Sequence, residues 1–354
     1  MEAISPRGDA TLKKPLLVTG GAGFIGSHLV DALLDRGENV RVLDDLSSGR
    51  LENLARARQS GRLQVTVGSV CDLPLFRAQI EGCARIYHLA ASVGVDMVTN
   101  RPSESLRNNV EGVQNLFAAI SDSQPPERVV LFSSSEVYGK SSQLPLREES
   151  DLVLGPSTVP RWSYASGKVM GEFLALGEYQ RCGRPVTVVR CFNTCGPRQR
   201  ASYGMVVPRF LDQALAGEPI TVYGDGTQTR CFSYVGDVVE GVVRLAEHPD
   251  AVGQVYNLGS DRETSILELA QRVVALTGSA SSIRLFPYAQ VYGDSFQDVR
   301  RRVPDLGKIR RLLGDLPSTD LDALLRAALV DRRNGGHGSH RPETPAIKGA
   351  RPAA

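Results

Sequence analysis

The residue pair best suited to proton transfer is Tyr164 and Lys168, in the segment WSYASGKVMGE. This segment has helical spacing, and residues four apart on a helix lie on the same face. An ammonium group beside a phenol lowers the phenol pKa and favours a phenolate base. Such pairs are also common on ordinary helix surfaces, so the role of this one depends on the segments around it.

A second reactive group lies upstream, where the segment RVVLFSSS ends and opens into EVYGK. Ser134 and Ser135 supply hydroxyl groups there, and Glu136 supplies a carboxylate directly after them. Hydroxyl groups at a strand end support the interpretation that the tyrosine–lysine pair belongs to a catalytic site. A structural alternative for Glu136 is that it caps the loop or pairs with a basic side chain.

A glycine-rich loop, VTGGAGFIGSHL, separates the first strand-like segment from the first helix-like segment. Gly20, Gly23 and Gly26 let the backbone approach a pyrophosphate, and the helix N-terminus supplies N–H donors. Phe24 and Ile25 belong to the same loop. A tight structural turn would also explain the loop alone, but the strand before it and the helix after it favour a dinucleotide site.

Two acidic residues, Asp44 and Asp45, end the second strand-like segment. A carboxylate at this place accepts hydrogen bonds from ribose hydroxyl groups and repels a 2′-phosphate. These residues therefore predict NAD, rather than NADP, as the cofactor.

Strand-like and helix-like segments alternate along the chain, and the strands are nearly all apolar and rich in β-branched residues. This pattern predicts an α/β fold, a Rossmann-type doubly wound parallel sheet with helices on both faces. The predicted strands are 15–21, 39–45, 63–70, 85–91, 128–135 and 185–193, and predicted helices include 24–37, 108–122 and 163–183.

Composition narrows the function classes. The chain has 354 residues, a net charge of +2 and a pI near 8.2, which does not favour binding to nucleic acid or to an anionic membrane. No apolar run reaches transmembrane length. The six cysteines form no CxxC pair, so we expect reduced thiols in a cytoplasmic protein and no metal site.

Six motifs together resemble the extended short-chain dehydrogenase/reductase family: TGGAGFIG, HLAA, SSSEVYG, YASGK, RCFNTCGPRQ and YGDGTQTRCFSYVGDV. The resemblance is to the nucleotide-sugar branch of 4-epimerases, 4,6-dehydratases and UDP-glucuronate decarboxylases, and it extends roughly over residues 15–330. It implies NAD as the cofactor, a UDP-sugar substrate, and a homodimer formed through two helices of each subunit.

The resemblance also implies roles for single residues. Tyr164 would take the proton of the sugar 4-hydroxyl while NAD+ takes the C4 hydride. Lys168 would lower the Tyr164 pKa and hold the nicotinamide ribose, and Ser134 would hydrogen-bond the 4-oxygen. The remaining expected cofactor contacts are Leu89, Ala90, Ala91 and Asn109, and the expected substrate contacts are Asn193, Arg198, Val207, Tyr223, Arg230, Arg300 and Arg302. Arg300 and Arg302 are expected at the diphosphate because Ser295 replaces an arginine common in epimerases.

The reaction is predicted from the two residues that follow Ser134. Decarboxylases resemble TSEVYG, whereas dehydratases resemble TDEVYG, in which the aspartate serves as an acid that Ser135 replaces poorly. Oxidation of a glucuronate at C4 gives a β-keto acid that can lose carbon dioxide. Ser135 and Glu136 would orient the sugar, disfavour the bound carboxylate by charge repulsion and manage the proton returned to C5.

The favoured interpretation is a UDP-glucuronate decarboxylase that gives UDP-xylose or UDP-4-keto-pentose. The main alternative is a UDP-hexose 4-epimerase, which needs no carboxylate at position 136. A 4,6-dehydratase and a non-catalytic NAD-binding protein are less favoured; the latter would be expected to lack Tyr164 or Lys168.

The predicted organisation has two interleaved units. The NAD-binding domain spans 15–192, and 231–259 return to it; a smaller α/β nucleotide-sugar lobe spans 193–230 and 260–331. Residues 1–14 are predicted to be a flexible tail. Residues 332–354 are rich in Gly, Pro and charge and are predicted to be disordered.

Overall fold

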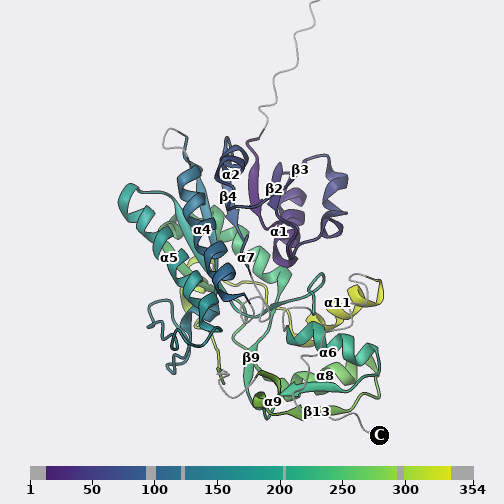
Figure 1. Ribbon diagram of the computed structural model, residues 1–354. Helices are drawn as coiled ribbons and strands as arrows, with labels where there is room; N and C mark the ends of the chain where they lie inside the picture. The colour runs from purple at the N-terminus through teal and green to yellow at the C-terminus, as the bar shows by residue number, and fades with distance from the viewer. Residues whose placement is uncertain (1–12, 93–100, 121–123, 202–204, 293–298, 336–354) are drawn as a thin grey trace, which may run out of the picture.

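The computed structural model describes residues 13–92, 101–120, 124–201, 205–292 and 299–335 (Figure 1). Its main element is a seven-stranded sheet of order β11-β6-β5-β4-β1-β2-β3, in which every neighbouring pair is parallel. The strands are β1 (Leu16–Thr19), β2 (Val40–Asp44), β3 (Leu63–Val67), β4 (Arg85–His88), β5 (Arg128–Ser134), β6 (Val186–Cys191) and β11 (Gln254–Leu258). The predicted Rossmann-type sheet and its six strands are confirmed, and β11 is the segment that returns from later in the chain.

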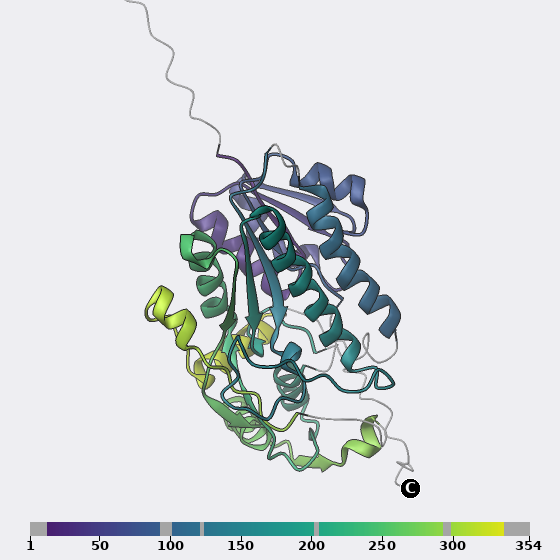
Figure 2. The same cartoon turned by 90° about the vertical axis from the view of Figure 1, so that its left-hand side faces the viewer.

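Both faces of the sheet are covered because successive apolar residues of one strand point to opposite sides. Leu17 belongs to one hydrophobic core and Val18 to the other, and neither is exposed. Helices α1 (Phe24–Asp35) and α7 (Val235–Glu247) contribute to the Val18 core. Helices α2 (Leu73–Ile80), α4 (Pro102–Ala119) and α5 (Trp162–Cys182) contribute to the other. Figure 2 shows α4 and α5 side by side across this face.

A smaller lobe lies below the carboxyl ends of the strands in Figure 1 and has a core of its own. Its helices are α6 (Val206–Leu215), α8 (Ile266–Thr277), α9 (Tyr288–Tyr292) and α11 (Leu321–Arg333). Its short strand pairs are β8 (Ile220–Tyr223) with β13 (Ile283–Phe286), and β9 (Thr229–Cys231) with β12 (Glu263–Ser265). The pair β7 (Thr194–Cys195) and β10 (Ser233–Tyr234) lies where the chain crosses between the two units.

Two boundaries differ from the predicted ones. Helix α10 (Gly307–Leu313) belongs to the sheet domain, because Leu306 and Ile309 are buried in the α1/α7 core. Helix α11 runs past the predicted start of the C-terminal tail because the Arg332 guanidinium pairs with Asp212 at 2.6 Å and donates to the Gln199 carbonyl. The remainder of that predicted tail, 336–354, and residues 1–12 of the N-terminal one lie outside the described residues.

Four 3-10 turns complete the described elements: η1 (Leu51–Leu54), η2 (Ala57–Ser60), η3 (Ser135–Tyr138) and η4 (Pro249–Ala251). The turn η3 matters most for function because it directly follows β5 and carries Glu136. Ser134 caps it by accepting the Glu136 main-chain N–H at 3.2 Å.

Candidate active site

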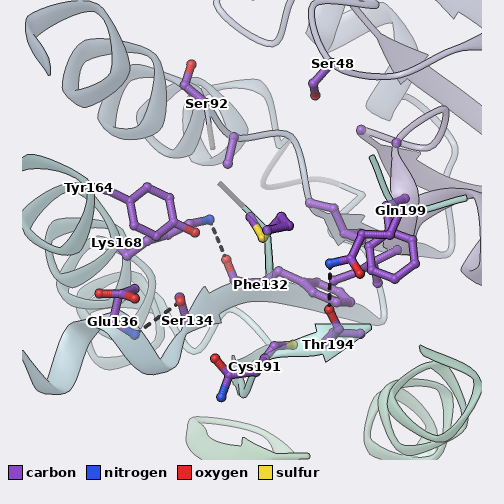
Figure 3. Close-up of a pocket in the computed structure, with 18 of the residues that line it drawn as sticks. Ser48, Ser92, Phe132, Ser134, Glu136, Tyr164, Lys168, Cys191, Thr194 and Gln199 are labelled. Atoms are coloured by element: carbon purple, nitrogen blue, oxygen red, sulfur yellow. Dashed lines mark hydrogen bonds between the residues drawn. The ribbon is translucent and has the colours of Figure 1, made fainter. Parts of the chain in front are cut away.

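A cavity of about 630 Å³ extends from the glycine-rich loop, past the ends of β4 and β5, into the smaller lobe (Figure 3). It lies where ligands bind in open α/β sheets, outside the carboxyl ends of the strands. The predicted site residues that line it are Gly20, Gly23, Phe24, Ile25, Gly26, Asp44, Asp45, Leu89, Ala90, Ala91, Ser134, Ser135, Glu136, Tyr164, Lys168, Asn193, Val207, Tyr223, Arg230 and Arg302.

The glycine loop is packed so tightly that side chains are excluded from it. A Cβ atom at Gly26 would lie 2.1 Å from the Gly20 carbonyl oxygen, and one at Gly20 would lie 2.9 Å from the Ala90 nitrogen. Helix α1 begins immediately after Gly23, and no described side chain caps its N-terminus. The first N–H groups of α1 and its positive dipole end therefore suit a pyrophosphate.

Asp44 ends β2 next to this loop and is buried. Its carboxylate accepts the Ala22 N–H at 2.8 Å and the Leu46 N–H at 2.9 Å, and burial raises its pKa. Each carboxylate oxygen retains a further lone pair, so ribose hydroxyl groups can still donate to it. Asp44 thus both fixes the loop and presents a negative charge to the cavity.

Helix α5 places Tyr164 and Lys168 one turn apart beside the end of β5, where Figure 3 shows them with Ser134 and Glu136. The Lys168 ammonium donates to the Phe132 carbonyl at 2.8 Å, and burial lowers the Lys168 pKa to about 8. The Tyr164 pKa is raised, first by burial and then by the Glu136 charge, while a hydrogen bond with Ser134 opposes the shift. Burial is thus the main cause of the raised Tyr164 pKa, and the expected lowering of that pKa by Lys168 stays a prediction.

A buried ion pair fixes α5 against the sheet below these residues. Glu172, one turn beyond Lys168, pairs with Arg190 of β6 at 2.7 Å and accepts the Ser133 hydroxyl at 2.5 Å. Helix α5, β5 and β6 are thus joined directly behind the reactive side chains. Because Ser133 directly precedes Ser134, these bonds also restrict movement of Tyr164 relative to Ser134.

Glu136 lies between two arginines. Its carboxylate accepts from Arg302 Nη1 at 2.6 Å and lies 3.7 Å from Arg161 Nη2. Although burial raises the Glu136 pKa, the charges of Arg302 and Arg161 lower it further, to about 2. The Glu136 carboxylate therefore stays ionised near neutral pH and is paired with two cations, whereas its expected repulsion of a substrate carboxylate and its proton transfer stay predictions.

Arg302 is only 3% exposed. Its Nη1 binds Glu136, but its Nε and Nη2 have no partner among the described residues. In an arginine, Nε and Nη2 form a planar fork that matches the two oxygens of a carboxylate. A buried guanidinium with two unpaired donors is costly, and an anionic ligand group bound beside Arg302 in the cavity would offset that cost.

The lobe end of the cavity carries Val207 and Tyr223, as predicted, and also Arg209, which the sequence interpretation missed. The Arg209 guanidinium carbon lies 4.0 Å from the centre of the Tyr223 ring. Arg230 Nη1 donates to the Thr229 carbonyl at 2.7 Å, and the Asn193 amide donates to the Cys231 carbonyl at 3.2 Å. Apolar, aromatic and cationic groups together suit a base and a phosphate chain.

Three predicted ligand contacts do not line the cavity. Arg198 pairs instead with Asp31 of α1 at 2.7 Å, and Arg300, 78% exposed at its side chain, pairs with Asp225 at 3.2 Å. Asn109 accepts from the Ser92 N–H at 2.7 Å and donates to the Ser92 carbonyl at 3.2 Å, so it holds a wall residue without lining the cavity itself. Each side chain thus binds another part of the protein, although Arg198 Nη1 has no partner among the described residues.

Arg161 and Gln199 are among the other cavity residues that the sequence interpretation missed. Arg161 precedes Tyr164 by three residues, and the basic side chain at the start of an active-site helix was an available signal. Gln199 donates to the Thr194 carbonyl at 3.1 Å across the cavity from Tyr164 (Figure 3). No local sequence pattern distinguishes Gln199 from an ordinary loop residue.

Comparison with known proteins agrees with this geometry. The family model described as "NAD dependent epimerase/dehydratase family" matches residues 16–259. The chain belongs to this family. Its sequence is 36% identical over 319 residues to the UDP-N-acetyl-alpha-D-glucosaminuronate decarboxylase of Bacillus cytotoxicus, covering 90% of this chain and 97% of that protein. It is 36% identical to UDP-glucuronic acid decarboxylase 1 of Arabidopsis thaliana, covering 93% of this chain and 72% of that protein.

A solved structure of the epimerase/dehydratase type is also similar. It is the UDP-glucuronic acid 4-epimerase of Bacillus cereus in complex with UDP-glucuronic acid and NAD, with a TM-score of 0.79 and 28% identity, covering 90% of this chain and 99% of that one. The cofactor of the present protein is NAD: the glycine cradle, the uncapped α1 N-terminus and Asp44 fit a dinucleotide, and the family is NAD-dependent. Within the part of the chain that the structure describes, no helix is long and apolar enough to cross a bilayer and no cluster of metal ligands occurs.

Proposed function

We propose that this protein is an NAD-dependent UDP-glucuronate decarboxylase that converts its substrate into UDP-xylose or UDP-4-keto-pentose. The observation that carries the proposal is the buried fork of Arg302, which pairs with Glu136 on one side and has two donors without a described partner on the other. The decarboxylase relatives, similar over most of their length, support the same activity. A uronic acid supplies the carboxylate that such a fork requires.

The first step is oxidation at C4 of the sugar. NAD, when bound, supplies the acceptor for the C4 hydride. Tyr164 takes the proton from the 4-hydroxyl, and Ser134 hydrogen-bonds the same oxygen. Lys168 provides a positive charge that favours the Tyr164 phenolate, against the burial and the Glu136 charge that oppose it.

The second step follows from the product of the first. A C4 ketone lies β to the C5 carboxylate, so the C5–carboxylate bond breaks, carbon dioxide leaves and the electron pair passes into an enolate on the C4 oxygen. A proton from solvent water is then added at C5. Return of the hydride to C4 and of the Tyr164 proton to the 4-oxygen would give UDP-xylose, whereas release before this return would give UDP-4-keto-pentose. In this step Glu136 acts by anchoring Arg302, and Arg302 orients the carboxylate that will leave.

The substituent at C2 is a separate question, because one relative is named for an N-acetylated uronate and another for glucuronate. The test is therefore purified protein with NAD+ and, in parallel, UDP-glucuronate and UDP-N-acetylglucosaminuronate, with products identified by mass spectrometry. Loss of carbon dioxide from UDP-glucuronate is expected. Loss of carbon dioxide from UDP-N-acetylglucosaminuronate alone would identify that compound, and not UDP-glucuronate, as the substrate.

The second candidate is a 4-epimerase, favoured by the similarity to the UDP-glucuronic acid 4-epimerase structure. Such an enzyme would keep the carboxylate and invert C4. The UDP-hexose 4-epimerase considered from the sequence would need no carboxylate receptor, so Arg302 argues against it. Products of unchanged mass but altered C4 configuration, resolved by chromatography against standards, would replace decarboxylation with epimerisation.

We also propose that the protein forms a homodimer through α4 and α5. The support is an apolar surface on α5, where Phe173 is 72% exposed and Met170 is 47% exposed. Large exposed apolar groups close together are typical of interaction surfaces. Sedimentation of wild type and of Phe173→Asp tests the proposal: the variant should sediment as a monomer, and equal masses for both proteins would contradict it.

A cytoplasmic location is likewise proposed. All six cysteines are free, as expected of a reducing compartment. Cell fractionation with an antibody to the native protein tests this, and recovery from an oxidising compartment would contradict it.

A further inference from the structure

One buried amide outside the cavity joins the two segments that carry Glu136 and Arg302. Asn257, in β11, has no exposed surface. Its side-chain nitrogen donates to the Leu146 carbonyl at 2.9 Å and to the Asp305 carbonyl at 3.2 Å. Its side-chain oxygen accepts the Tyr138 hydroxyl at 2.6 Å.

These contacts fix both chain segments that carry the Glu136–Arg302 ion pair. Tyr138 lies in η3, two residues after Glu136, so the Tyr138–Asn257 bond fixes the end of the turn that carries this acid. Asp305 lies three residues after Arg302 and is held at its carbonyl by the same amide.

The segment after Arg302 is fixed further by Leu146. The Leu146 N–H donates to the Val303 carbonyl at 2.8 Å, and the Asp305 N–H donates to the Leu146 carbonyl at 2.7 Å. Because Asn257 also donates to that Leu146 carbonyl, the strand-like pairing at 303–305 is tied to the sheet. The backbone directly after Arg302 is therefore fixed, which restricts the positions that its guanidinium can reach.

We propose that Asn257 is a positioning residue for decarboxylation: it sets the separation of Glu136 and Arg302, and so the place where the Arg302 fork holds the substrate carboxylate. The inference rests on the proposed function. Asparagine fits this position because its amide provides two donors and an acceptor on one short side chain. Aspartate would provide no donor for the two carbonyls, and leucine would provide neither donor nor acceptor.

A positioning role and simple support of the fold predict different kinetic effects, because a positioning residue affects one step of the reaction and not the other. C4 oxidation uses Tyr164, Lys168 and Ser134, which α5 and β5 hold through the Glu172–Arg190 pair. Decarboxylation uses Arg302, and Asn257 fixes the chain segment that follows Arg302 by binding the Asp305 carbonyl. Loss of Asn257 bonds should therefore slow release of carbon dioxide much more than it slows C4 oxidation.

The experiment measures both steps in one single-turnover reaction with UDP-glucuronate, following reduction of bound NAD+ by absorbance and carbon dioxide by isotope release. The variants are Asn257→Asp and the milder Tyr138→Phe, which removes the hydroxyl that donates to Asn257. Phenylalanine keeps the ring that lies 4.8 Å from the Arg190 guanidinium carbon, so this contact with the Glu172–Arg190 pair is retained. Because small displacements of reacting groups have large kinetic effects, we expect carbon dioxide release to fall about 100-fold and about 10-fold respectively, with C4 oxidation changed by less than about threefold.

A matched control is Thr187→Val. Thr187 is also fully buried and hydrogen-bonded at its side chain, to Ala251 and Arg128, but at the opposite end of β6 from the cavity. The Thr187→Val variant should be less stable than wild type, but its rates of C4 oxidation and of carbon dioxide release should change by the same factor. In an Arg302→Met background, Asn257→Asp should add less than about a twofold further loss, because both changes act through the same group.

Two kinetic results would overturn the proposal: equal slowing of both steps in Tyr138→Phe, or a full additional loss in the Arg302→Met background. If the wild-type protein releases no carbon dioxide from either uronate, the proposed function fails, and the crystal structure of Tyr138→Phe decides the positioning role alone. An Arg302 Nη1–Glu136 Oε1 distance unchanged from 2.6 Å would then refute it, and a displaced Arg302 would support it.

Discussion

The two ends of the cavity are built in different ways. The cofactor end is formed by backbone: glycines of one continuous loop, the first turn of α1, and an acid that binds main-chain N–H groups. The sugar end is formed by charged side chains from distant segments, and Arg302 and Glu136 are 166 residues apart in the chain. We therefore expect added side-chain atoms to impair the cofactor end, and loss of a single charged group to impair the sugar end.

The largest expected effect is at the sugar end. Arg302→Met removes the carboxylate fork, and loss of one positioned donor group typically costs about 10² to 10³-fold in rate, so we expect release of carbon dioxide from UDP-glucuronate to fall about 10³-fold. NAD affinity, measured by calorimetry, should not change. Arg300→Met is the matched control, because that neighbouring arginine pairs with Asp225 at the surface. Retention of activity within about threefold in Arg302→Met would contradict the carboxylate role.

At the cofactor end, a single methyl group should have the next largest effect. In Gly26→Ala the new Cβ would lie 2.1 Å from the Gly20 carbonyl oxygen, so the loop and the start of α1 must move apart. Overpacking of this kind costs about 1–3 kcal/mol, which corresponds to about 10 to 100-fold weaker NAD binding if the cost falls on the bound loop. Calorimetric titration measures it.

The control for this substitution is Gly177→Ala, in α5, where an added Cβ meets no atom within 4 Å. That variant should bind NAD as wild type does and gain slightly in helix stability. Equal NAD affinity for Gly26→Ala and Gly177→Ala would mean that the glycine loop does not constrain the dinucleotide.

The same contrast explains what the sequence could predict. The parallel sheet, the glycine loop and Asp44 depend on local spacing, and Gly20, Gly26 and Asp44 lie where the pattern placed them. Family motifs likewise predicted Tyr164, Lys168 and Ser134 beside the cavity. Backbone-built sites follow from contiguous residues, so one segment is enough to recognise them.

Side-chain pairing is different because the partner of a charge depends on the tertiary fold. Arg198 and Arg300 were expected at the substrate, yet Asp31 and Asp225 lie closer to them. Conversely, Arg302 was expected at the diphosphate, and its pairing with Glu136 changes the interpretation of both residues. Spacing along the chain carries no information about these choices.

Substitution of Asp44 should change the cofactor end by an intermediate amount. Asp44→Asn keeps the shape but removes the charge that favours ribose hydroxyl donors, so NAD affinity should fall about tenfold, as expected for hydrogen bonds to a charged group. Discrimination against NADP should narrow, because the repulsion of the 2′-phosphate is lost. Parallel titrations with NAD and NADP measure both effects, and an unchanged NAD/NADP preference would assign that preference to the backbone instead.

The smallest expected effect is on stability in acid, and it has opposite signs at the two ends. Glu136 has its pKa lowered from the usual 4.5 to about 2, so its ion pair stabilises the fold above pH 4.5 and this contribution is lost as pH falls through 2. Because Glu136 is partly exposed, we expect the contribution to be on the order of 1 kcal/mol after solvent screening.

Asp44 has its pKa raised by burial, so its ionised form opposes folding. The folded protein therefore takes up this proton at a higher pH than the unfolded chain does, and stability is gained as pH falls through the raised pKa towards 3.8. Urea unfolding of the apoprotein at pH 7 and at pH 3.5 should show a smaller acid loss in Glu136→Gln than in wild type, and a larger one in Asp44→Asn. The same acid loss in all three proteins would mean that neither carboxylate differs in environment between the folded and unfolded states, and that the electrostatic contrast between the two ends of the cavity does not extend to folding.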